Sequence, residues 1–463
     1  MAMAMAAGTR KRLLLVAATA GYQTKIFAVV ARRLGVEVSL ATDRCHVLND
    51  PWGDQAIPVR FEALEESAAE LARGRSFDAV AAVGDRPAYL AALSAELLRV
   101  PFHPPAAAAA AINKFAAREC FRKAGLPVPM YSRVALDEDA EAAASRAQYP
   151  CVLKPLGLSA SRGVIRANSP QEFVAAFTRI RNLLKSAGVA RLSDPASDHI
   201  LVETFLPGRE FALEGLVTDG RLHVLALFDK PDPMDGPYFE ETIYVSPSRE
   251  PLRVQEAIMR AAQLAVTALG LHFGPVHAEM RVDGERVWML EVAPRPIGGL
   301  CAKALVFADG APLEELIVRH ALGEDVSRAR RRDGAAGVMM IPVPCAGIYQ
   351  GVRGFDRAEA LADEVIITAK QGQLVLPLPE GDTYLGFLFA YGETASEVEE
   401  RLRQAHKHLE FEIVETRVEG AANFAGVRKH QTFALAVGDV IAEGVIAAVK
   451  DVASAKNLTK CLR

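Results

Sequence analysis

The 463-residue sequence lacks the features that mark membrane, nucleic-acid-binding and disulfide-rich proteins. It has no run of about 18 uncharged apolar residues, so we expect no transmembrane helix and no membrane partner. The formal net charge is -4, and no basic block with interleaved aromatics stands out, which argues against nucleic acid as a partner. The six cysteines are scattered, with neither metal-ligand spacing nor a dense framework, and this usage indicates a reducing cytoplasm.

The N-terminal region allows two interpretations. Basic residues 10–12 precede an apolar run at 13–18 and a small-residue stretch ending at Ala20, which fits a signal peptide. However, Gly21 then offers a turn, and apolar residues from Ile26 to Leu34 recur at helical spacing. We therefore predict that the run is a buried first strand.

The first hundred residues have the rhythm of a parallel α/β sheet, and the length of the chain allows two to four domains. Apolar runs at 13–18, 36–41 and 79–83 alternate with helical patterns, and each ends near turn or polar residues. No G-x-G-x-x-G follows the first run, so a dinucleotide site is not supported.

Nearly every chemically suggestive residue lies between Asn113 and Glu324. A cluster of arginines at 328–332 then indicates an exposed linker. A smaller α+β segment follows to about residue 418, and the tail at 419–463 is compatible with helix but suggests no function.

The first chemical signal is the run VLKPLGLSASRGV at residues 152–164, which places Lys154 at a strand end. The loop after it is rich in small residues: Gly157, Ser159, Ser161 and Gly163. Such a loop lets backbone N–H groups approach phosphate oxygens, and the lysine adds a positive charge. Because the Walker A spacing is absent, an ordinary solvent-exposed loop explains this sequence pattern equally well.

The second signal is the run ILVETFLPGREF at residues 200–211, in which Glu203 and Glu210 flank a Pro-Gly turn. Adenine needs one donor and one acceptor between apolar walls, and the backbone from Glu203 to Leu206 could provide them. A plain hairpin is the alternative.

The third signal is a pair of carboxylates, Glu279 in GPVHAEMRV and Glu291 in VWMLEVAPRPIGG, separated by a short turn. A hairpin would bring them together, and carboxylates among apolar neighbours are costly unless they are paired or bind metal. Magnesium prefers such hard oxygen ligands, whereas zinc would want His or Cys at tighter spacing. The alternative is that both face solvent or pair with Arg281 or Arg295.

In this order and combination, the phosphate loop, base hinge and metal pair resemble the ATP-grasp superfamily. Within it, the chain looks like the branch of L-amino acid ligases and related carboxylate–amine ligases, over about Lys11 to Val414. The most specific segments are NKFAARECFRKAGLPVP at 113–129, the lysine loop, the E-x-F-x-x-G-x-E hinge, H-A-E, and E-x-x-x-R followed by Gly-Gly.

The resemblance implies a multidomain protein of mixed α/β and α+β class. The expected parts are a Rossmann-like parallel α/β domain at 1–110, an ATP-grasp fold of two α+β subdomains at 111–326 with its lid at about 130–205, a small α+β module at 327–418, and the tail at 419–463. The segment 383–394 and a helix at 397–409 resemble the C-terminal module of the same branch, to which we assign a packing role.

The resemblance also implies roles for single residues. The nucleotide set is Lys114, Lys154, Ser159, Ser161, Glu203, Thr204, Phe205, Leu206 and Glu210. In it, the two lysines contact phosphates, the backbone at 203–206 meets adenine, and Glu210 binds the ribose; Lys114 alone would be an exposed helix charge.

The same family pattern assigns the metal and the transfer chemistry. Glu279 and Glu291 become ligands of magnesium, with manganese as an alternative. Lys154 and Arg295 are the catalytic candidates, and Arg295 would face the transferred phosphate and the negative charge of the tetrahedral intermediate. Its alternative role is a partner for Glu291. Ala293 stands where many family members have Asn, so one oxygen ligand is missing and a second metal ion is in doubt.

Substrate contacts are predicted in the long Pro- and Asp-rich segment 228–248, which resembles the part of L-amino acid ligases that meets the amino acid. Lys230, Glu240 and Glu241 are its candidates, although a solvated loop would look the same. His277 is either a substrate contact or a buried histidine satisfied by hydrogen bonds, and we favour the second.

The predicted function is therefore an ATP-dependent carboxylate–amine ligase that forms an amide or peptide bond through an acyl phosphate and releases ADP and phosphate. Its substrates would be a small-molecule carboxylate and an amine, both amino acids. A carboxylase or purine-pathway ligase is the nearest alternative, and a nonenzymatic ATP-binding protein is the alternative of another class. A homodimer is compatible with the sequence.

Overall fold

The computed structural model describes residues 10–18, 23–43, 56–192 and 194–416. The turn predicted at Gly21 and the tail at 419–463 lie outside these residues. In the part that is described, no helix combines the length and apolarity needed to cross a bilayer.

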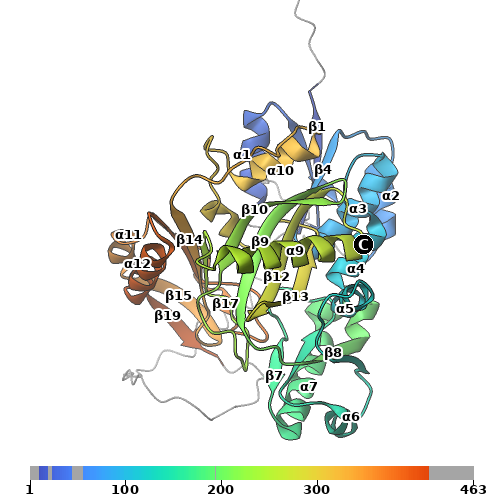
Figure 1. Cartoon of the computed structure of the whole chain (residues 1–463), viewed down its shortest axis with the longest axis vertical. Coiled ribbons are helices and arrows are strands. Elements are labelled where there is room, and N and C mark those ends of the chain that lie inside the picture. Colours follow the sequence, from blue (N-terminus) through green and yellow to red (C-terminus); the bar gives the residue numbers. More distant parts are fainter. Residues whose placement is uncertain (1–9, 19–22, 44–55, 193, 417–463) are drawn as a thin grey trace, which may run out of the picture.

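The N-terminal unit is a four-stranded parallel sheet (Figure 1). Its strands, in order across the sheet, are β3 (Ala56–Pro58), β2 (Glu37–Thr42), β1 (Arg12–Ala17) and β4 (Ala79–Val83). The strand prediction for the first apolar run is confirmed, while β3 had no clear signal in the sequence. A continuous apolar run suits β1 because neighbouring strands and helices bury both of its faces.

Helices cover both sides of this sheet, as in a doubly wound fold. They are α1 (Thr24–Arg33) and α10 (Leu313–Ala321) on one side, and α2 (Leu64–Ala72) and α3 (Asp85–Leu98) on the other. Leu13 and Leu15 pack with the first pair, whereas Leu14 and Val16 pack with the second. The carboxyl end of β4 leads directly into α3 at Asp85.

The middle of the molecule is an eight-stranded antiparallel sheet. Its strands, in order, are β13 (Arg286–Ala293), β12 (Gly274–Asp283), β9 (Arg209–Thr218), β10 (Arg221–Asp229), β11 (Ile243–Ser246), β14 (Ala335–Ile341), β18 (Gly386–Gly392) and β16 (Glu364–Ile367). The last three come from the segment expected to form a small C-terminal module. That segment therefore continues the central sheet.

The two faces of the central sheet differ because side chains alternate along each strand. On β12, one face receives Val276, Ala278, Met280 and Val282, and the other receives His277, Glu279 and Arg281. The first face packs under α9 (Leu252–Leu269), α4 (Pro105–Ile112) and α5 (Lys114–Lys123) (Figure 1). The second face is polar and belongs to the candidate site.

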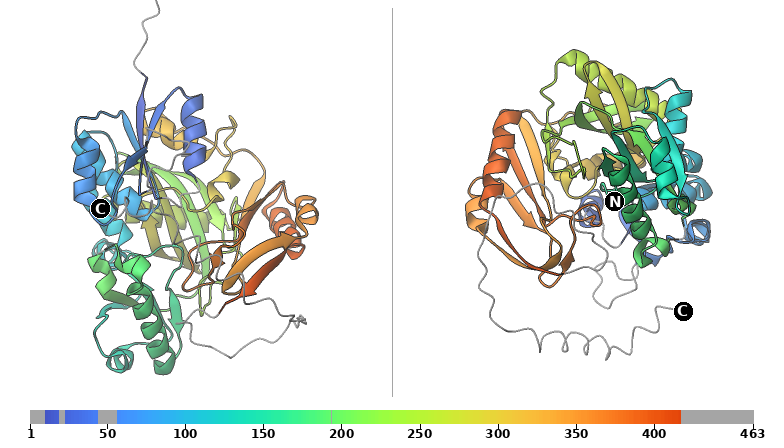
Figure 2. Two further views of the ribbon diagram at one scale, coloured as in Figure 1. Left: turned by 180° about the vertical axis from the view of Figure 1, so that it is seen from behind. Right: turned by 90° about the horizontal axis from the view of Figure 1, so that it is seen from below.

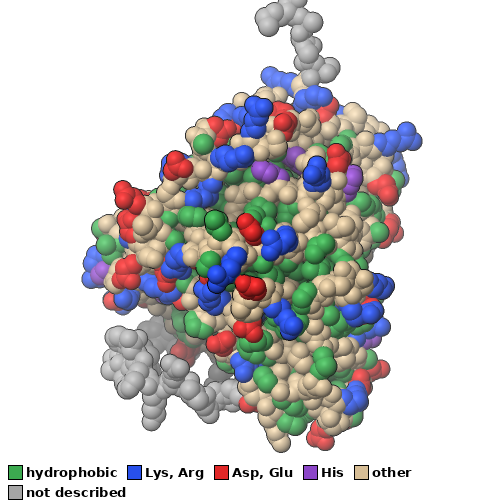
Figure 3. Space-filling model, viewed as in Figure 1, with side chains coloured by type: hydrophobic (Ala, Val, Ile, Leu, Met, Phe, Trp, Pro, Cys, Tyr) green, Lys and Arg blue, Asp and Glu red, His purple; other side chains and the backbone are tan. Residues whose placement is uncertain are grey.

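The outer surface on the α9 side mixes hydrophobic, basic and acidic side chains (Figure 3). Leu252 and Leu264 of α9 are among its exposed apolar residues.

A second, smaller antiparallel sheet forms the lid. Its strands, in order, are β5 (Tyr131–Ala135), β8 (His199–Thr204), β6 (Cys151–Pro155) and β7 (Ile165–Ala167). Three helices accompany it: α6 (Ala140–Arg146), α7 (Pro170–Leu184) and α8 (Ala187–Ala190). Short 3-10 helices also occur at Pro195–Asp198 and Cys301–Ala304.

The chain passes from the lid to the central sheet at residues 205–208, between β8 and β9. These two strands lie in different sheets, so the plain hairpin considered for this segment is wrong. Gly208 makes the passage possible: its φ is +97°, and a Cβ there would lie 2.2 Å from the Val282 carbonyl oxygen. Only glycine fits so close an approach of two backbones.

The remaining C-terminal elements lie beside β14 and β18. A three-stranded sheet contains β17 (Leu374–Val375), β15 (Gly347–Arg353) and β19 (Glu410–Glu415), accompanied by α11 (Phe355–Glu359) and α12 (Ala395–Lys407). The central sheet lies between these elements and the lid (Figure 2).

Candidate active site

A cavity of about 920 Å³ opens between the N-terminal unit, the lid and the polar face of the central sheet. The predicted site residues that line it are Lys114, Lys154, Ser159, Ser161, Glu203, Thr204, Phe205, Leu206, Glu210, Glu241, His277, Glu279, Glu291 and Arg295. The phosphate loop, the base hinge and the carboxylate pair, which are separate in the sequence, therefore line the same cavity. Among the described residues, the structure does not bring Lys230 and Glu240 to its wall.

The carboxylate pair lies on β12 and β13, where Glu279 is directly opposite Glu291. The register shifts immediately beyond this pair, because Met280 is opposite Met289 and leaves Leu290 as an extra residue. This β-bulge turns Glu291 onto the same face as Glu279, since Met289 and Val292 both face α9. Both carboxylates are about one-fifth exposed, and they point into the cavity instead of open solvent.

Cations surround these carboxylates. Lys114 Nζ lies 3.7 Å and Arg295 Nη2 3.9 Å from Glu291. Although burial opposes it, the ammonium of Lys230 and the ring of His277 hold the pKa of Glu279 well below its usual range. Both acids are thus set among positive groups, with the salt-bridge alternative realised by Arg295 and not by Arg281.

The phosphate-loop candidate covers one side of the cavity with residues 157–162. Ala160 and Ser161 have φ of +54° and +53°, so the loop folds back on itself. Lys114 Nζ donates to the Leu158 carbonyl at 2.6 Å, and Lys154 Nζ lies 2.7 Å from Glu203. Burial lowers the pKa of Lys154, and Glu203 partly offsets that effect. Lys114 therefore contacts the loop that could receive phosphate, and Lys154 lines the same cavity while paired with Glu203.

The hinge backbone is partly free for a ligand. Phe205 N–H donates to the Pro150 carbonyl at 2.9 Å, and the Leu206 carbonyl accepts from Arg281. Within the described chain, the Phe205 carbonyl and the Leu206 N–H have no hydrogen-bond partner. Apolar side chains surround them in a small cluster made of Val152, Val164, Phe205, Met234 and Phe239. One acceptor and one donor thus lie between apolar walls.

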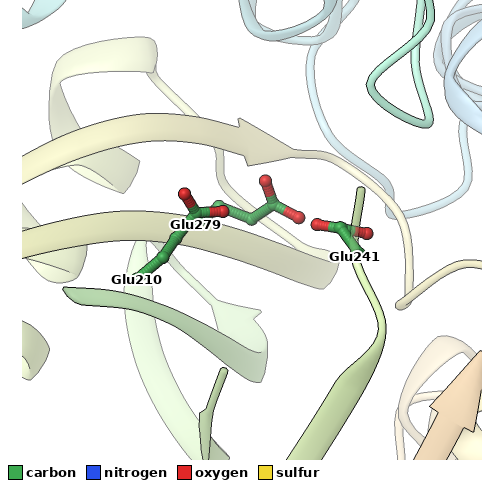
Figure 4. A group of neighbouring side chains, drawn as sticks. All are labelled: Glu210, Glu241 and Glu279. Atoms are coloured by element: carbon green, nitrogen blue, oxygen red, sulfur yellow. The ribbon is translucent and has the colours of Figure 1, made fainter. Parts of the chain in front are cut away.

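Glu210, Glu241 and Glu279 form an acidic trio whose ligand atoms lie within 4.8 Å of one another (Figure 4). Lys230 already supplies a cation to all three, with Nζ at 2.9, 2.5 and 3.3 Å respectively. Its side chain is 3% exposed. Lys230 therefore lies beneath the cavity and neutralises the trio. Burial and the neighbouring Glu279 raise the pKa of Glu241 to about 7.

His277 is buried and hydrogen-bonded at both ring nitrogens, as the favoured interpretation predicted. Nδ1 lies 3.1 Å from Glu214, and Nε2 lies 3.3 Å from Glu279. Burial lowers its pKa, but the two carboxylates prevail and raise it to about 9. Ala293 lies opposite His277 on β13, and it is buried. Its methyl side chain offers no oxygen ligand to a metal ion.

Two residues of the site were not singled out from the sequence. Asp85 accepts from Arg295 Nε at 2.7 Å and Nη2 at 3.4 Å. Its only sequence signal was its place after a parallel strand, where such sheets gather ligands. Arg118 is fully buried, bonds Glu203 at 2.5 Å and donates to the Leu290 carbonyl at 2.9 Å. It thereby connects α5 to both the hinge strand and the bulge.

Comparison with known proteins gives this geometry a family. Residues 147–304 match the ATP-grasp domain, and residues 339–414 match the L-amino acid ligase C-terminal domain 2. The chain contains an ATP-grasp domain.

Individual relatives of this ATP-grasp protein support the assignment. Alanine–anticapsin ligase of Bacillus amyloliquefaciens is 31% identical over 205 residues, which cover 42% of this chain and 43% of the relative. The chain thus spans less than half the length of that relative. D-alanine–D-alanine ligase of Aromatoleum aromaticum is 27% identical over 216 residues, which cover 46% of this chain and 65% of the relative.

Among solved structures, the L-amino acid ligase from Bacillus licheniformis has a similar fold. Its TM-score is 0.70 at 24% identity, and the match covers 89% of this chain and 100% of that one. The predicted fold class, an N-terminal α/β unit followed by an ATP-grasp fold and a C-terminal α+β part, is confirmed.

Proposed function

We propose that this ATP-grasp protein is an ATP-dependent carboxylate–amine ligase that joins two amino acids. ATP would phosphorylate the carboxylate of one substrate, and the amine of the other would displace phosphate to give an amide, ADP and phosphate. The observation that carries the proposal is the position of Glu279 opposite Glu291 in the same cavity as Lys114, Lys154 and Arg295.

Glu279 and Glu291 would hold magnesium, or manganese in its place. Their donor set fits, because two carboxylates in register offer hard oxygens beside a phosphate loop. We favour this pair over the acidic trio because Lys230 Nζ lies closer to Glu210 and Glu241, at 2.9 and 2.5 Å, than to Glu279, at 3.3 Å. Magnesium would supply charge neutralisation for the phosphates there.

The apolar hinge pocket would bind adenine. The free Phe205 carbonyl and Leu206 N–H match the exocyclic amine and ring nitrogen of the base, and Phe205 and Phe239 supply flat apolar walls. Glu210, at the start of β9, would bind the ribose hydroxyls.

The transfer step asks the protein mainly to place reactants and neutralise charge. Lys114 and Lys154 would hold phosphates from the lid side. Arg295, which Asp85 orients, would stabilise the negative charge that develops on the activated carboxylate. No protein nucleophile is required.

The match to an L-amino acid ligase C-terminal domain favours this reaction over a carboxylase or purine-pathway reaction. A nonenzymatic nucleotide-binding role remains the contrasting proposal, because Ala293 removes one oxygen ligand found in many relatives.

The test is phosphate and ADP release with pairs of amino acids, followed by mass spectrometry of the product. We expect amino-acid-dependent release that falls about 100-fold or more in Glu291→Gln, which removes one metal ligand. Glu285→Gln, an exposed carboxylate in the turn of the same hairpin, is the matched control and should keep full activity. Tight ATP binding by the wild type without turnover on any carboxylate would instead support the nonenzymatic role.

A further inference from the structure

The cavity extends past Glu279 toward the C-terminal strands. Its wall there is formed by Tyr244, Cys301, Met340 and Tyr384, together with the carboxylate of Glu241. We call this part the side-chain chamber. It is built from four separate parts of the chain: β11, the 3-10 helix at Cys301–Ala304, β14, and the segment that leads into β18.

Three contacts define the arrangement of the chamber. The Tyr244 hydroxyl lies 3.5 Å from Glu279 Oε1, so the chamber begins at the proposed metal ligand. Met340 N–H donates to the carbonyl of Thr242 at 2.7 Å, which places Met340 beside the residue that follows Glu241. Tyr384 lines the same cavity, and its ring centroid lies 6.0 Å from that of Phe387.

Among the described residues, Glu241 is the one carboxylate of the chamber wall, and one of its oxygens lies 2.5 Å from Lys230 Nζ. The other wall residues, Tyr244, Tyr384, Cys301 and Met340, present aromatic, thiol and thioether groups. Lys230 Nζ lies 4.9 Å from the centroid of the Tyr244 ring and is paired with the acidic trio. The chamber thus offers one carboxylate among aromatic, thioether and thiol surfaces.

We propose that Met340 and Tyr384 set the side-chain specificity of the activated amino acid, and that this substrate is an α-amino acid with an uncharged, apolar side chain. Glu241 would meet the α-ammonium group, and the carboxylate would point back toward Glu279 and Arg295. This inference rests on the proposed ligase function.

The chemistry of the chamber excludes charged side chains. An aspartate or glutamate side chain would face Glu241 without a cation to pair with it. A lysine or arginine side chain would lose water against Met340 and the aromatic rings without a free partner. An apolar side chain gains from burial on every wall, and its permitted size depends on how far Met340 reaches into the space.

The experiment compares amino-acid preference in the wild type, Met340→Ala and Met340→Trp. Enlarging the chamber should shift the preference in kcat/KM at least tenfold toward leucine and phenylalanine relative to alanine. Filling it should shift the preference by a similar factor toward alanine. Tyr384→Ala provides a second enlargement with the same expected direction.

Met339→Ala is the matched control. Met339 is the neighbouring residue on β14, but it packs on the opposite face of the sheet in a different apolar cluster. It should change stability without changing preference.

Binding must be measured beside turnover. Titration calorimetry of each amino acid uses protein saturated with magnesium and a non-hydrolysable ATP analogue. Opposite shifts in binding for the two Met340 variants support the chamber, and they would do so even if the wild type released no phosphate, a result that would contradict only the ligase function. Unchanged preference in all three chamber variants, or wild-type preference for glutamate or lysine, would overturn the inference.

Discussion

Asp85 is the residue through which the N-terminal sheet reaches the transfer site. It lies at the first position of α3 and accepts two hydrogen bonds from Arg295, which holds the pKa of its carboxyl below the usual range despite burial. Without this contact, the guanidinium can turn toward Glu291, 3.9 Å away. We infer that Asp85 positions Arg295.

We expect Asp85→Asn to lower kcat by about 10- to 100-fold while the KM for ATP changes little, since a small misplacement of a reacting group has effects of this size. Steady-state kinetics and nucleotide titration separate the two quantities. Asp219→Asn, an exposed carboxylate far along the chain, should leave both unchanged. A parallel rise in KM for ATP with unchanged kcat would contradict the positioning role.

The residues of the site differ in how far the sequence could predict them. The alternation of apolar and polar residues in GPVHAEMRV predicts that Glu279 and His277 lie on one face of a strand. The structure places both on the same face of β12. Counted forward from Met289, the same alternation would put Glu291 on the α9 side. Only the bulge at Leu290 brings it to the cavity. A bulge depends on packing between strands, so no local pattern could predict it. The burial of Lys230 against Glu210 and Glu241 likewise depends on packing, so no local pattern could predict it.

At the scale of elements, the lid is held by a contact with the C-terminal part of the chain, which we call the lid clasp. Arg179 on α7 bonds Glu380 through two nitrogens, at 2.5 and 2.7 Å, and its third nitrogen bonds the Tyr238 hydroxyl. Nearby, Gly163 N–H donates to the Pro379 carbonyl at 2.9 Å. The clasp therefore ties both α7 and the phosphate loop to the segment before β18.

Removing the contacts of the lid clasp should lower the affinity of the protein for ATP. A part-exposed ion pair contributes on the order of 1 kcal/mol, so Arg179→Gln should weaken ATP binding by about fivefold. Calorimetry measures the affinity, and hydrogen exchange should show faster exchange across α7 and β6. Arg181→Gln lies on the same helix outside the clasp and serves as the control.

Charge reversal tests the clasp directly. Arg179→Glu alone should weaken ATP binding further, and adding Glu380→Arg should restore most of it. No recovery in the double variant would show that the pair does not couple lid and C-terminal segment.

At the scale of the whole molecule, His103 joins the N-terminal unit to the central sheet. Its Nε2 lies 3.0 Å from the Pro275 carbonyl, and its Nδ1 accepts from His272 N–H at 3.3 Å. Only a neutral ring with its proton on Nε2 satisfies both bonds. Burial accordingly lowers the pKa of His103 to about 4.

This histidine predicts a loss of stability in mild acid. The ring of His103 takes up a proton near pH 6.5 in the unfolded chain and only near pH 4 in the folded chain. The contribution of His103 to the free energy of unfolding is therefore fully present above pH 6.5 and is lost as the pH falls from 6.5 to 4. The loss should be on the order of 2–3 kcal/mol. Urea unfolding followed by circular dichroism from pH 7 to 4.5 measures it.

His103→Gln should flatten that pH dependence, because Gln can still donate to Pro275 but does not titrate. His272→Gln, at an exposed ring, should retain the wild-type slope. Equal slopes in all three proteins would assign the acid sensitivity to other groups.

The overall architecture was largely predictable, because apolar runs, the hinge and the carboxylate pair each follow local rules and their order resembles one superfamily. The assembly of the sheets was not. Whether β14 starts a new sheet or pairs with β11 depends on long-range contacts that no short pattern encodes, and the structure shows pairing from Ile243 opposite Met339 to Ser246 opposite Ala336.

That pairing limits how such proteins can be recombined. A chimera that joins the ATP-grasp segment of one relative to the C-terminal segment of another would have to pair β11 of the first with β14 of the second. The same exchange would replace the part of the chamber wall that lies beside Tyr244. Exchange of C-terminal segments among relatives should therefore alter which amino acids are accepted and, where the edges fit poorly, expose an unpaired strand to aggregation.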